Sequence, residues 1–134
     1  MVYGRMEDII CCAIDDDSDR EGGIIRFVIR CGICGAPWRS EPRRFSVAGR
    51  TAENENKQII YDAMWEREAE DARKSAVEEA MNHFNHCPIC KRLSCEFCFR
   101  ICETIDMCST CAEKLEEPGE KVIIDNTVEL GIRN

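Results

Sequence analysis

Residues 86–111, HCPICKRLSCEFCFRICETIDMCSTC, hold seven of the eleven cysteines in this chain of 134 residues. Six of the seven form Cys-x-x-Cys pairs, and a fourth pair lies far upstream in RCGICGAPW. The four pairs are Cys31/Cys34, Cys87/Cys90, Cys95/Cys98 and Cys108/Cys111. Two residues between the cysteines let both sulfurs face one metal ion, and a following glycine such as Gly35 permits the backbone turn. Four such pairs predict two tetrathiolate sites and therefore two zinc ions per chain.

Two other chemistries use the same kind of pair. A redox dithiol needs a thioredoxin-like setting, in which the pair opens a helix after a strand, and none of the four pairs has it. An iron–sulfur cluster is chemically possible, because soft sulfur ligands also accept iron, but two separate knuckle-type sites favour zinc. The order of pairing stays open. A sequential scheme joins the first pair to the second, whereas a crossed scheme joins the first pair to the third.

The stretch HCPICKRLSCEFC, followed by MCSTCAEKL, resembles the second half of a FYVE domain. The shared features are a histidine before the knuckle, the Cys-x2-Cys-x4-Cys-x2-Cys spacing and a last pair that opens a terminal helix. The resemblance covers residues 86 to about 115 and implies a treble-clef or zinc-ribbon architecture with two metals and crossed pairs. FYVE domains have only a short segment between their first two cysteine pairs. In this chain the corresponding segment is long, residues 35–86, and includes the expected helix. The basic lipid-reading signature is also absent around Cys87, so lipid binding is not implied. The pattern is similar as well to small bacterial zinc-ribbon proteins of uncharacterised function.

The whole chain, residues 1–134, is expected to form a single small α+β zinc-binding domain. Residues 24–48 are rich in β-branched and aromatic residues on both sides of Cys31/Cys34, which predicts a zinc-knuckle hairpin. Residues 51–85 lack proline and glycine, and their apolar residues recur at three- and four-residue steps, which predicts one long helix with Thr51 as its N-cap. Its apolar face comprises Tyr61, Trp65, Ala69, Ala72, Ala76, Ala80 and Phe84, broadened by Val77 and Met81.

Three further segments complete the expected architecture. Residues 1–23 form an N-terminal segment whose first fourteen residues suit a strand or a helix and whose DDDSDREGG stretch is expected to be an acidic loop. Residues 86–117 form the cysteine-rich double-zinc core and end in a short helix. Residues 118–134 form a C-terminal strand segment. Cys11, Cys12 and Cys102 are expected to be structural, with a ligand role for Cys102 as the alternative. His83 and His86 are expected to be exposed or capping, with a ligand role as the alternative.

The formal net charge of −8 disfavours binding to phosphate backbones or anionic lipids, which require clustered Lys and Arg. The exception is local: Arg39, Arg43, Arg44 and Arg50 lie close together in the sequence. We expect these arginines to be a solvated hairpin edge, and a nucleic-acid-binding zinc ribbon that uses them is the alternative function. The sequence has no secretory signal and no apolar stretch long enough to span a membrane, so we expect a cytoplasmic protein without a membrane partner.

Sites filled by four thiolates leave no position for water or substrate, so they are expected to stabilise the fold. The sequence contains no Gly-x-Ser-x-Gly, no His-Glu-x-x-His and no phosphate-binding glycine-rich loop, and we therefore expect no enzyme. The leading hypothesis is a zinc-stabilised adaptor or regulatory module that binds another protein. The long helix could bind that protein or pair with a second copy of the chain. A RING-like ubiquitin-ligase module is less well supported, because the usual histidine ligand is missing.

Overall fold

Helix α2, Glu55–Met81, is the longest element of the computed structural model, which describes residues 5–121. Its N-cap is Asn54, whose side-chain oxygen accepts a hydrogen bond from the backbone N–H of Lys57 over 2.9 Å. At 1.5 Å per residue, α2 is about 40 Å long. The prediction of one long helix is confirmed, but both of its ends are wrong. Asn54 satisfies a free N–H group of the first turn, so the N-cap lies three residues after Thr51, and the helix ends at Met81, four residues before the predicted end.

The described chain folds as two compact units. We call the first the helical unit, residues 5–30 and 37–82, and the second the cysteine unit, residues 31–36 and 83–121. The helical unit contains both longer helices, and the cysteine unit contains all eight paired cysteines. Within the described residues, no helix is long and apolar enough to cross a membrane.

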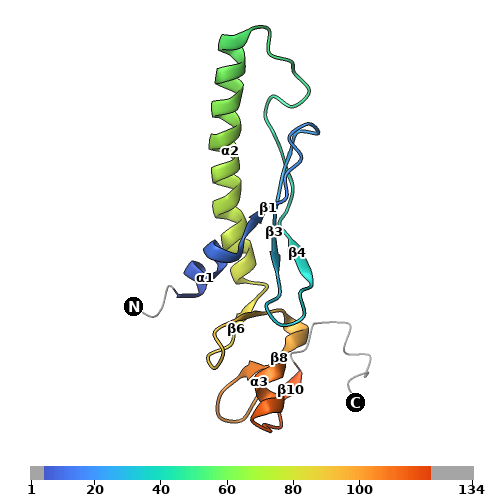
Figure 1. The fold of residues 1–134 in the computed structure, drawn as a ribbon, viewed down its shortest axis with the longest axis vertical. Helices are drawn as coiled ribbons and strands as arrows, with labels where there is room; N and C mark the ends of the chain where they lie inside the picture. The colour runs from blue at the N-terminus through green and yellow to red at the C-terminus, as the bar shows by residue number, and fades with distance from the viewer. Residues whose placement is uncertain (1–4, 122–134) are drawn as a thin grey trace. The chain divides into compact units, whose positions relative to one another are not determined.

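The helical unit combines two helices with short antiparallel strands, and α1 and β3 both contact α2. Its remaining elements are α1 (Arg5–Ala13), β1 (Asp15–Asp16), β2 (Ile24–Ile25), β3 (Phe27–Arg30), β4 (Pro37–Arg39) and β5 (Arg43–Arg44). Strands β1, β3 and β4 form one sheet (Figure 1). Strand β2 pairs with β5. The β3–β4 pairing places Ile29 opposite Trp38. This is the hairpin that the sequence predicts around the first cysteine pair.

The core of the helical unit forms where small residues on α2 allow other elements to come close. Ala72, Ala76 and Ala80 are buried on α2, and Phe27 and Ile29 of β3 are buried in the same unit. These positions match the face predicted for the helix. Met81 differs from the prediction: it is 41 % exposed.

An aromatic pair closes the same core farther along α2. The rings of Phe45 and Trp65 meet edge to face, with centroids 5.1 Å apart and planes at 75°. This arrangement brings the positive edge of one ring to the negative face of the other. The guanidinium of Arg20 lies over the Trp65 ring, 5.0 Å from the centroid, and forms a salt bridge with Asp62.

Polar side chains tie the segment after β4 to α2. Glu68 accepts hydrogen bonds from the backbone N–H of Ser46, over 2.9 Å, and from the Ser46 hydroxyl. Glu79 accepts from the backbone N–H of Glu41 over 3.2 Å. These two glutamates therefore fix the path of the chain.

The cysteine unit is built from short elements between the cysteine pairs. They are β6 (Asn85–His86), β7 (Leu93–Ser94), the 3-10 helix η1 (Glu96–Cys98), β8 (Phe99–Ile101), β9 (Met107–Cys108), α3 (Ser109–Lys114) and β10 (Glu120–Lys121). Strand β6 pairs with β7, and β8 lies between β10 and β9. As predicted, α3 begins inside the last cysteine pair; the sulfur of Cys108 caps it by accepting from the backbone N–H of Cys111.

The N-terminal segment differs in part from the prediction. Within the undecided first fourteen residues, 5–13 are the helix α1. The stretch expected to be an acidic loop contains a strand, because Asp15 and Asp16 pair with Val28 and Phe27. Most of the predicted C-terminal strand segment, residues 122–134, lies outside the described residues.

Candidate metal centre

The cysteine unit contains two groups of four cysteines that could each hold a metal ion. The first tetrad is Cys31, Cys34, Cys95 and Cys98, and the second tetrad is Cys87, Cys90, Cys108 and Cys111. In each group, all four Sγ atoms lie within 4.8 Å of one another. All eight cysteines predicted as ligands are therefore brought together, and the first pair joins the third. This is the crossed scheme that the FYVE resemblance implies.

The sulfur separations match those of a metal site and not those of disulfides. Sγ of Cys34 lies 3.9 Å from Sγ of Cys95, and Sγ of Cys90 lies 3.8 Å from Sγ of Cys108. A tetrahedral zinc ion with Zn–S bonds of about 2.3 Å separates its ligand sulfurs by about 3.8 Å. A disulfide requires about 2.05 Å, and all the cysteines are free. The donor set in each tetrad therefore fits zinc.

The first cysteine pair of each tetrad lies on the same kind of turn. The backbone N–H of Gly35 donates to the carbonyl of Cys31 over 2.9 Å, and that of Lys91 donates to the carbonyl of Cys87 over 2.8 Å. Both turns need a positive φ after the second cysteine, with φ of 79° at Gly35 and 67° at Lys91. Glycine adopts this conformation at little cost, but lysine is strained in it. The sequence identified Gly35 as suited to its turn but gave no such signal at Lys91.

Backbone N–H groups converge on the first sulfur of each tetrad. Sγ of Cys31 accepts from the N–H groups of Ile33 and Cys95, each over 3.3 Å. Sγ of Cys87 accepts from the N–H of Cys108 over 3.4 Å. In each tetrad, therefore, a backbone N–H of the pair that comes later in the sequence donates to a sulfur of the earlier pair. Such donors stabilise the thiolate form that a metal ion requires.

Burial and hydrogen bonding act in opposite directions on the thiols. Burial works to raise the pKa of Cys31, but the N–H groups that donate to its sulfur hold that pKa at about 6. Burial has the same effect on Cys90, where hydrogen bonds from the side chain and backbone of Arg92, together with those of the neighbouring Cys87 and Cys108, outweigh it and hold the pKa at about 6. Burial together with the neighbouring sulfurs raises the pKa of Cys111 to about 12 and also raises the pKa of Cys98. The pKa is therefore lowered at Cys31 in the first tetrad and at both Cys87 and Cys90 in the second. The negative charge of Cys98 and Cys111, whose pKa values are raised, requires a cation nearby.

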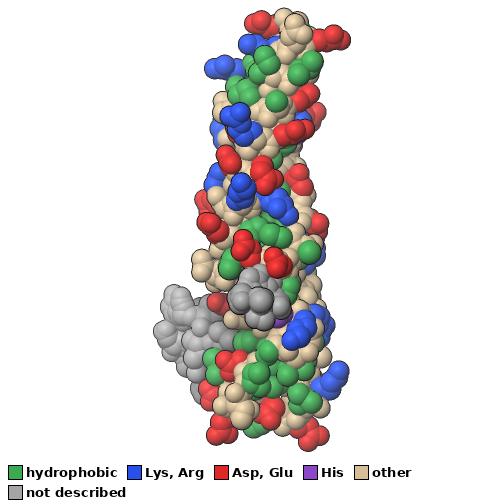
Figure 2. All heavy atoms as spheres, turned by 90° about the vertical axis from the view of Figure 1, so that its left-hand side faces the viewer, with side chains coloured by type: hydrophobic (Ala, Val, Ile, Leu, Met, Phe, Trp, Pro, Cys, Tyr) green, Lys and Arg blue, Asp and Glu red, His purple; other side chains and the backbone are tan. Residues whose placement is uncertain are grey.

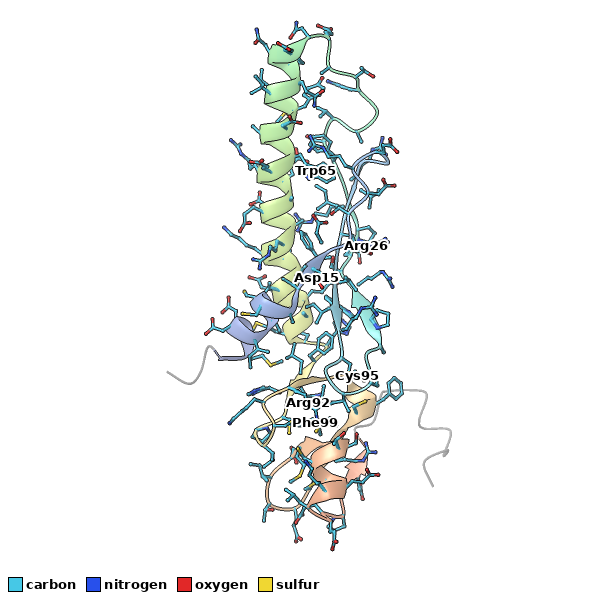
Figure 3. All side chains as sticks on the ribbon, viewed as in Figure 1. Asp15, Arg26, Trp65, Arg92, Cys95 and Phe99 are labelled. Carbon is cyan, nitrogen blue, oxygen red and sulfur yellow. The ribbon has the colours of Figure 1, made fainter. Side chains whose placement is uncertain are left out.

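Arg92 links the turn of the first tetrad to the second tetrad. Figure 3 labels Arg92 in the cysteine unit. Nε of Arg92 donates to Sγ of Cys90 over 3.3 Å, and its Nη1 donates to the carbonyl of Gly32 over 3.2 Å. The N–H of Gly32 in turn donates to the carbonyl of Leu93 over 2.8 Å. A Cβ atom at position 32 would lie 2.9 Å from that carbonyl oxygen, so the turn requires glycine here. Sequence reasoning missed Arg92, because spacing alone does not indicate which cation lies beside a sulfur.

The other cysteines and the histidines lie outside both tetrads. Cys102 is buried, as predicted, and the side chain of Asp106 accepts from its backbone N–H over 3.0 Å. Cys11 and Cys12 lie on α1, where Cys12 is exposed. Neither His83 nor His86 belongs to a tetrad. Among the described residues, the ligand roles considered as alternatives for Cys102 and the two histidines are not supported.

Two of the four clustered arginines are engaged within the protein. Nε of Arg39 donates to Asp17 over 3.0 Å, and Nη2 of Arg43 donates to the hydroxyl of Ser75 over 2.6 Å. Asp17 also pairs with Arg26. The hydrogen bond from Arg39, followed by the charge of Arg26, lowers the pKa of Asp17 against the opposing effect of burial. Arg44 lies on the short strand β5 with Arg43 and is exposed.

Comparison with known proteins adds no relative. No family model matches the chain, and neither curated proteins nor solved structures give a match.

Proposed function

We propose that the chain is a zinc-stabilised protein-interaction module with an adaptor or regulatory role and no catalytic activity of its own. One observation carries the proposal: in both tetrads all four ligand atoms are cysteine sulfurs. A tetrahedral ion bound there has no open position for water or substrate, so its contribution is to folding. The metal would hold the surface of the cysteine unit in one conformation.

The arrangement around the second tetrad supports a treble-clef architecture as part of this proposal. A knuckle turn carries Cys87 and Cys90, a hairpin of β8 and β9 follows, and α3 carries Cys111. Metal binding joins these parts at one point. A unit of this size has a small core, and two closed metal sites are a common way to stabilise such a unit.

The surface of the cysteine unit supports a role in protein binding. Phe97 is 72 % exposed, and Ile101 and Leu115 are more than half exposed. Figure 2 shows hydrophobic side chains gathered on the visible face of this unit, whereas charged side chains of both signs cover the visible face of the helical unit. Phe97 precedes the ligand Cys98 within η1, so a bound metal would fix the aromatic ring in place. Large side chains held rigidly at the surface are the usual anchors of protein interfaces.

Photo-crosslinking in the source cells tests the proposal. A chain with Phe97→p-benzoylphenylalanine is expected to form an adduct with a defined protein, and zinc chelation is expected to abolish the adduct. Glu103→p-benzoylphenylalanine is the matched control, because Glu103 is exposed in the same unit but is not apolar. The proposal fails if position 97 gives no adduct or if both positions give the same adducts.

Nucleic-acid binding through the arginine cluster is less well supported. The pairing of Arg39 with Asp17 and the bond from Arg43 to Ser75 reduce the charge available to a phosphate backbone. A titration with labelled single-stranded DNA distinguishes the two functions. Phosphate binding through the cluster would weaken steeply as salt rises, whereas the proposed module should not bind at all.

A further inference from the structure

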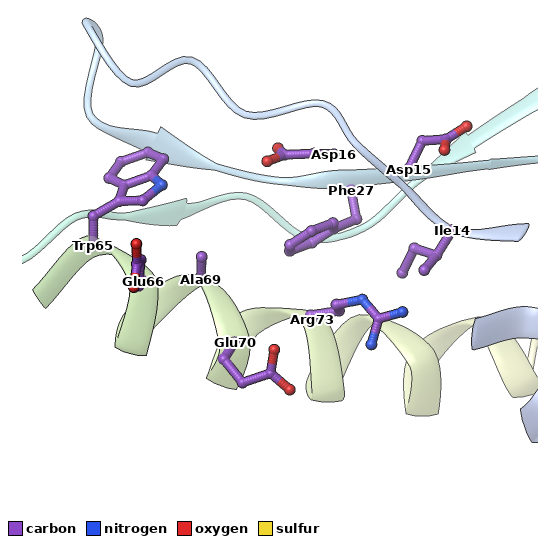
Figure 4. A pocket seen from close by; sticks show the side chains of 9 residues that line it. All are labelled: Ile14, Asp15, Asp16, Phe27, Trp65, Glu66, Ala69, Glu70 and Arg73. Carbon is purple, nitrogen blue, oxygen red and sulfur yellow. The ribbon is translucent and has the colours of Figure 1, made fainter. Parts of the chain in front are cut away.

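A groove in the helical unit lies between α2 and the strands β1 and β3 (Figure 4). It is open to solvent and has a volume of about 550 Å³. Ile14, Phe27, Trp65 and Ala69 form its apolar floor. Figure 4 shows Phe27 extending from the strands toward the helix and Trp65 extending from the helix toward the strands.

The rim of the groove is acidic. It carries Asp15, Asp16, Glu66 and Glu70, all of them exposed, and one cation, Arg73. Arg73 is already engaged, because its Nη2 donates to the carbonyl of Cys11 over 3.0 Å. The net charge around the apolar floor is therefore negative.

Three carboxylates follow one another along α2 at intervals of one turn: Asp62, Glu66 and Glu70. Residues four apart lie on the same side of a helix, so these like charges repel one another unless cations compensate them. Asp62 has its cation, because Arg20 pairs with it and lies over the Trp65 ring. Neither Glu66 nor Glu70 takes part in a salt bridge within residues 5–121.

We propose that this groove binds a lysine or arginine side chain of a partner protein. The aliphatic part of such a side chain would lie along the groove, above the buried floor residues Phe27 and Trp65, and its charged end would meet Glu66 and Glu70. Arg20 makes the same combination of contacts within the protein, with a carboxylate of α2 and the Trp65 ring. A metal cation is a poorer occupant, because among the described residues only the cysteine tetrads bring ligand atoms close enough together.

This inference rests on the proposed role in protein binding, and it names the chemistry that a partner presents to the helical unit. The groove lies in a different unit from Phe97. If the groove does not bind the peptide, the crosslinking result at Phe97 is therefore unchanged. If the Phe97 adduct is lost, the titration of the groove is unchanged.

Binding of a labelled peptide to the zinc-loaded full chain tests the inference. The probe is a fluorescein-labelled decapeptide in which arginine alternates with leucine and glycine. The reference peptide has citrulline, which keeps the shape of arginine without its charge. The arginine peptide is expected to bind saturably and the citrulline peptide at least about fivefold more weakly, since each exposed ion pair contributes up to about 1 kcal/mol.

Two double variants locate the site. Glu66→Gln with Glu70→Gln is expected to weaken binding of the arginine peptide about five- to tenfold. Asp71→Asn with Glu78→Gln removes the same charge from exposed positions of α2 that do not line the groove, and it is expected to leave affinity within about twofold of the unmodified chain. All four substitutions are at exposed positions, so folding should persist, and near-ultraviolet circular dichroism checks this. The inference is overturned if no saturable binding occurs, if the citrulline peptide binds equally well, or if the two double variants behave alike.

Discussion

The guanidinium of Arg92 donates a hydrogen bond to Sγ of Cys90 over 3.3 Å. Burial works to raise the pKa of that thiol, and this bond from Arg92 together with the other hydrogen bonds to the sulfur holds the pKa at about 6. The same side chain reaches the carbonyl of Gly32 in the turn of the first tetrad. One residue that is not a ligand therefore supports both candidate metal sites.

Replacing Arg92 should weaken the second tetrad. In Arg92→Ala, the Cys90 thiolate loses its charged donor, and we expect zinc affinity at this site to fall about tenfold, as for other residues that orient metal ligands. Competition with a chelating dye at neutral pH measures the change. Lys114→Ala is the control, because Lys114 is exposed in the cysteine unit and its substitution removes the same positive charge. Equal affinities for the two variants would contradict the role assigned to Arg92.

The two knuckle turns predict opposite effects of glycine. Lys91→Gly relieves a side chain held at φ of 67° and should stabilise the zinc-bound protein by about 0.5–1 kcal/mol. Gly35→Ala introduces a side chain at φ of 79°, where no other atom lies within 4 Å of the added Cβ. It should destabilise the zinc-bound protein by about 1–2 kcal/mol through backbone strain alone. Denaturant unfolding of the metal-bound chain gives both values. Changes of the same sign would refute the equivalence of the two turns.

Acid should release the metal and unfold the cysteine unit. The pKa values of Cys31 and Cys90 are lowered to about 6 from an ordinary value of 9.0, so the stability that these thiolates contribute is complete above pH 9 and is lost as the pH falls through about 6. A bound metal requires thiolates at all eight positions and extends the stable range to lower pH. Zinc release followed by a chelating dye should therefore have its midpoint below about pH 6. A midpoint above pH 7 would contradict the thiolate assignment.

Close packing of α2 within the helical unit predicts that a larger side chain is not tolerated at Ala76, which is 1 % exposed. Ala76→Leu should destabilise this unit by about 1–3 kcal/mol. Ala63→Leu lies on the same helix at an exposed position and should change stability by less than about 0.5 kcal/mol. Thermal unfolding followed at the tryptophan absorbance compares the two variants. A neutral Ala76→Leu would show that this face does not pack within the chain.

Local sequence signals predicted the parts of the fold that depend on local geometry. The eight cysteines were identified from their spacing, because two residues between cysteines already orient both sulfurs. The hairpin around Cys31 and the apolar face of α2 followed from residue periodicity. The start of α2 was misjudged because Thr51 and Asn54 are both good N-caps, and only the bond to Lys57 identifies the one used.

Features that join distant segments could not be predicted from the same signals. Spacing within a pair says nothing about which other pair completes the tetrad, so crossed and sequential schemes were equally compatible with the cysteines themselves. Pairing of Asp15 with Val28 overrides the loop preference of an acidic stretch. The groove of the helical unit was not visible in the sequence either, because its lining comes from β1, β3 and α2.

Metal analysis of paired cysteine variants tests the central claim most directly. The unmodified chain should bind two zinc ions. Cys34→Ser with Cys98→Ser removes two ligands of the first tetrad only and should leave one zinc ion per chain, whereas Cys34→Ser with Cys90→Ser damages both tetrads and should leave none. The reverse result, with one zinc ion retained by the second double variant and none by the first, would show sequential pairing and contradict the account.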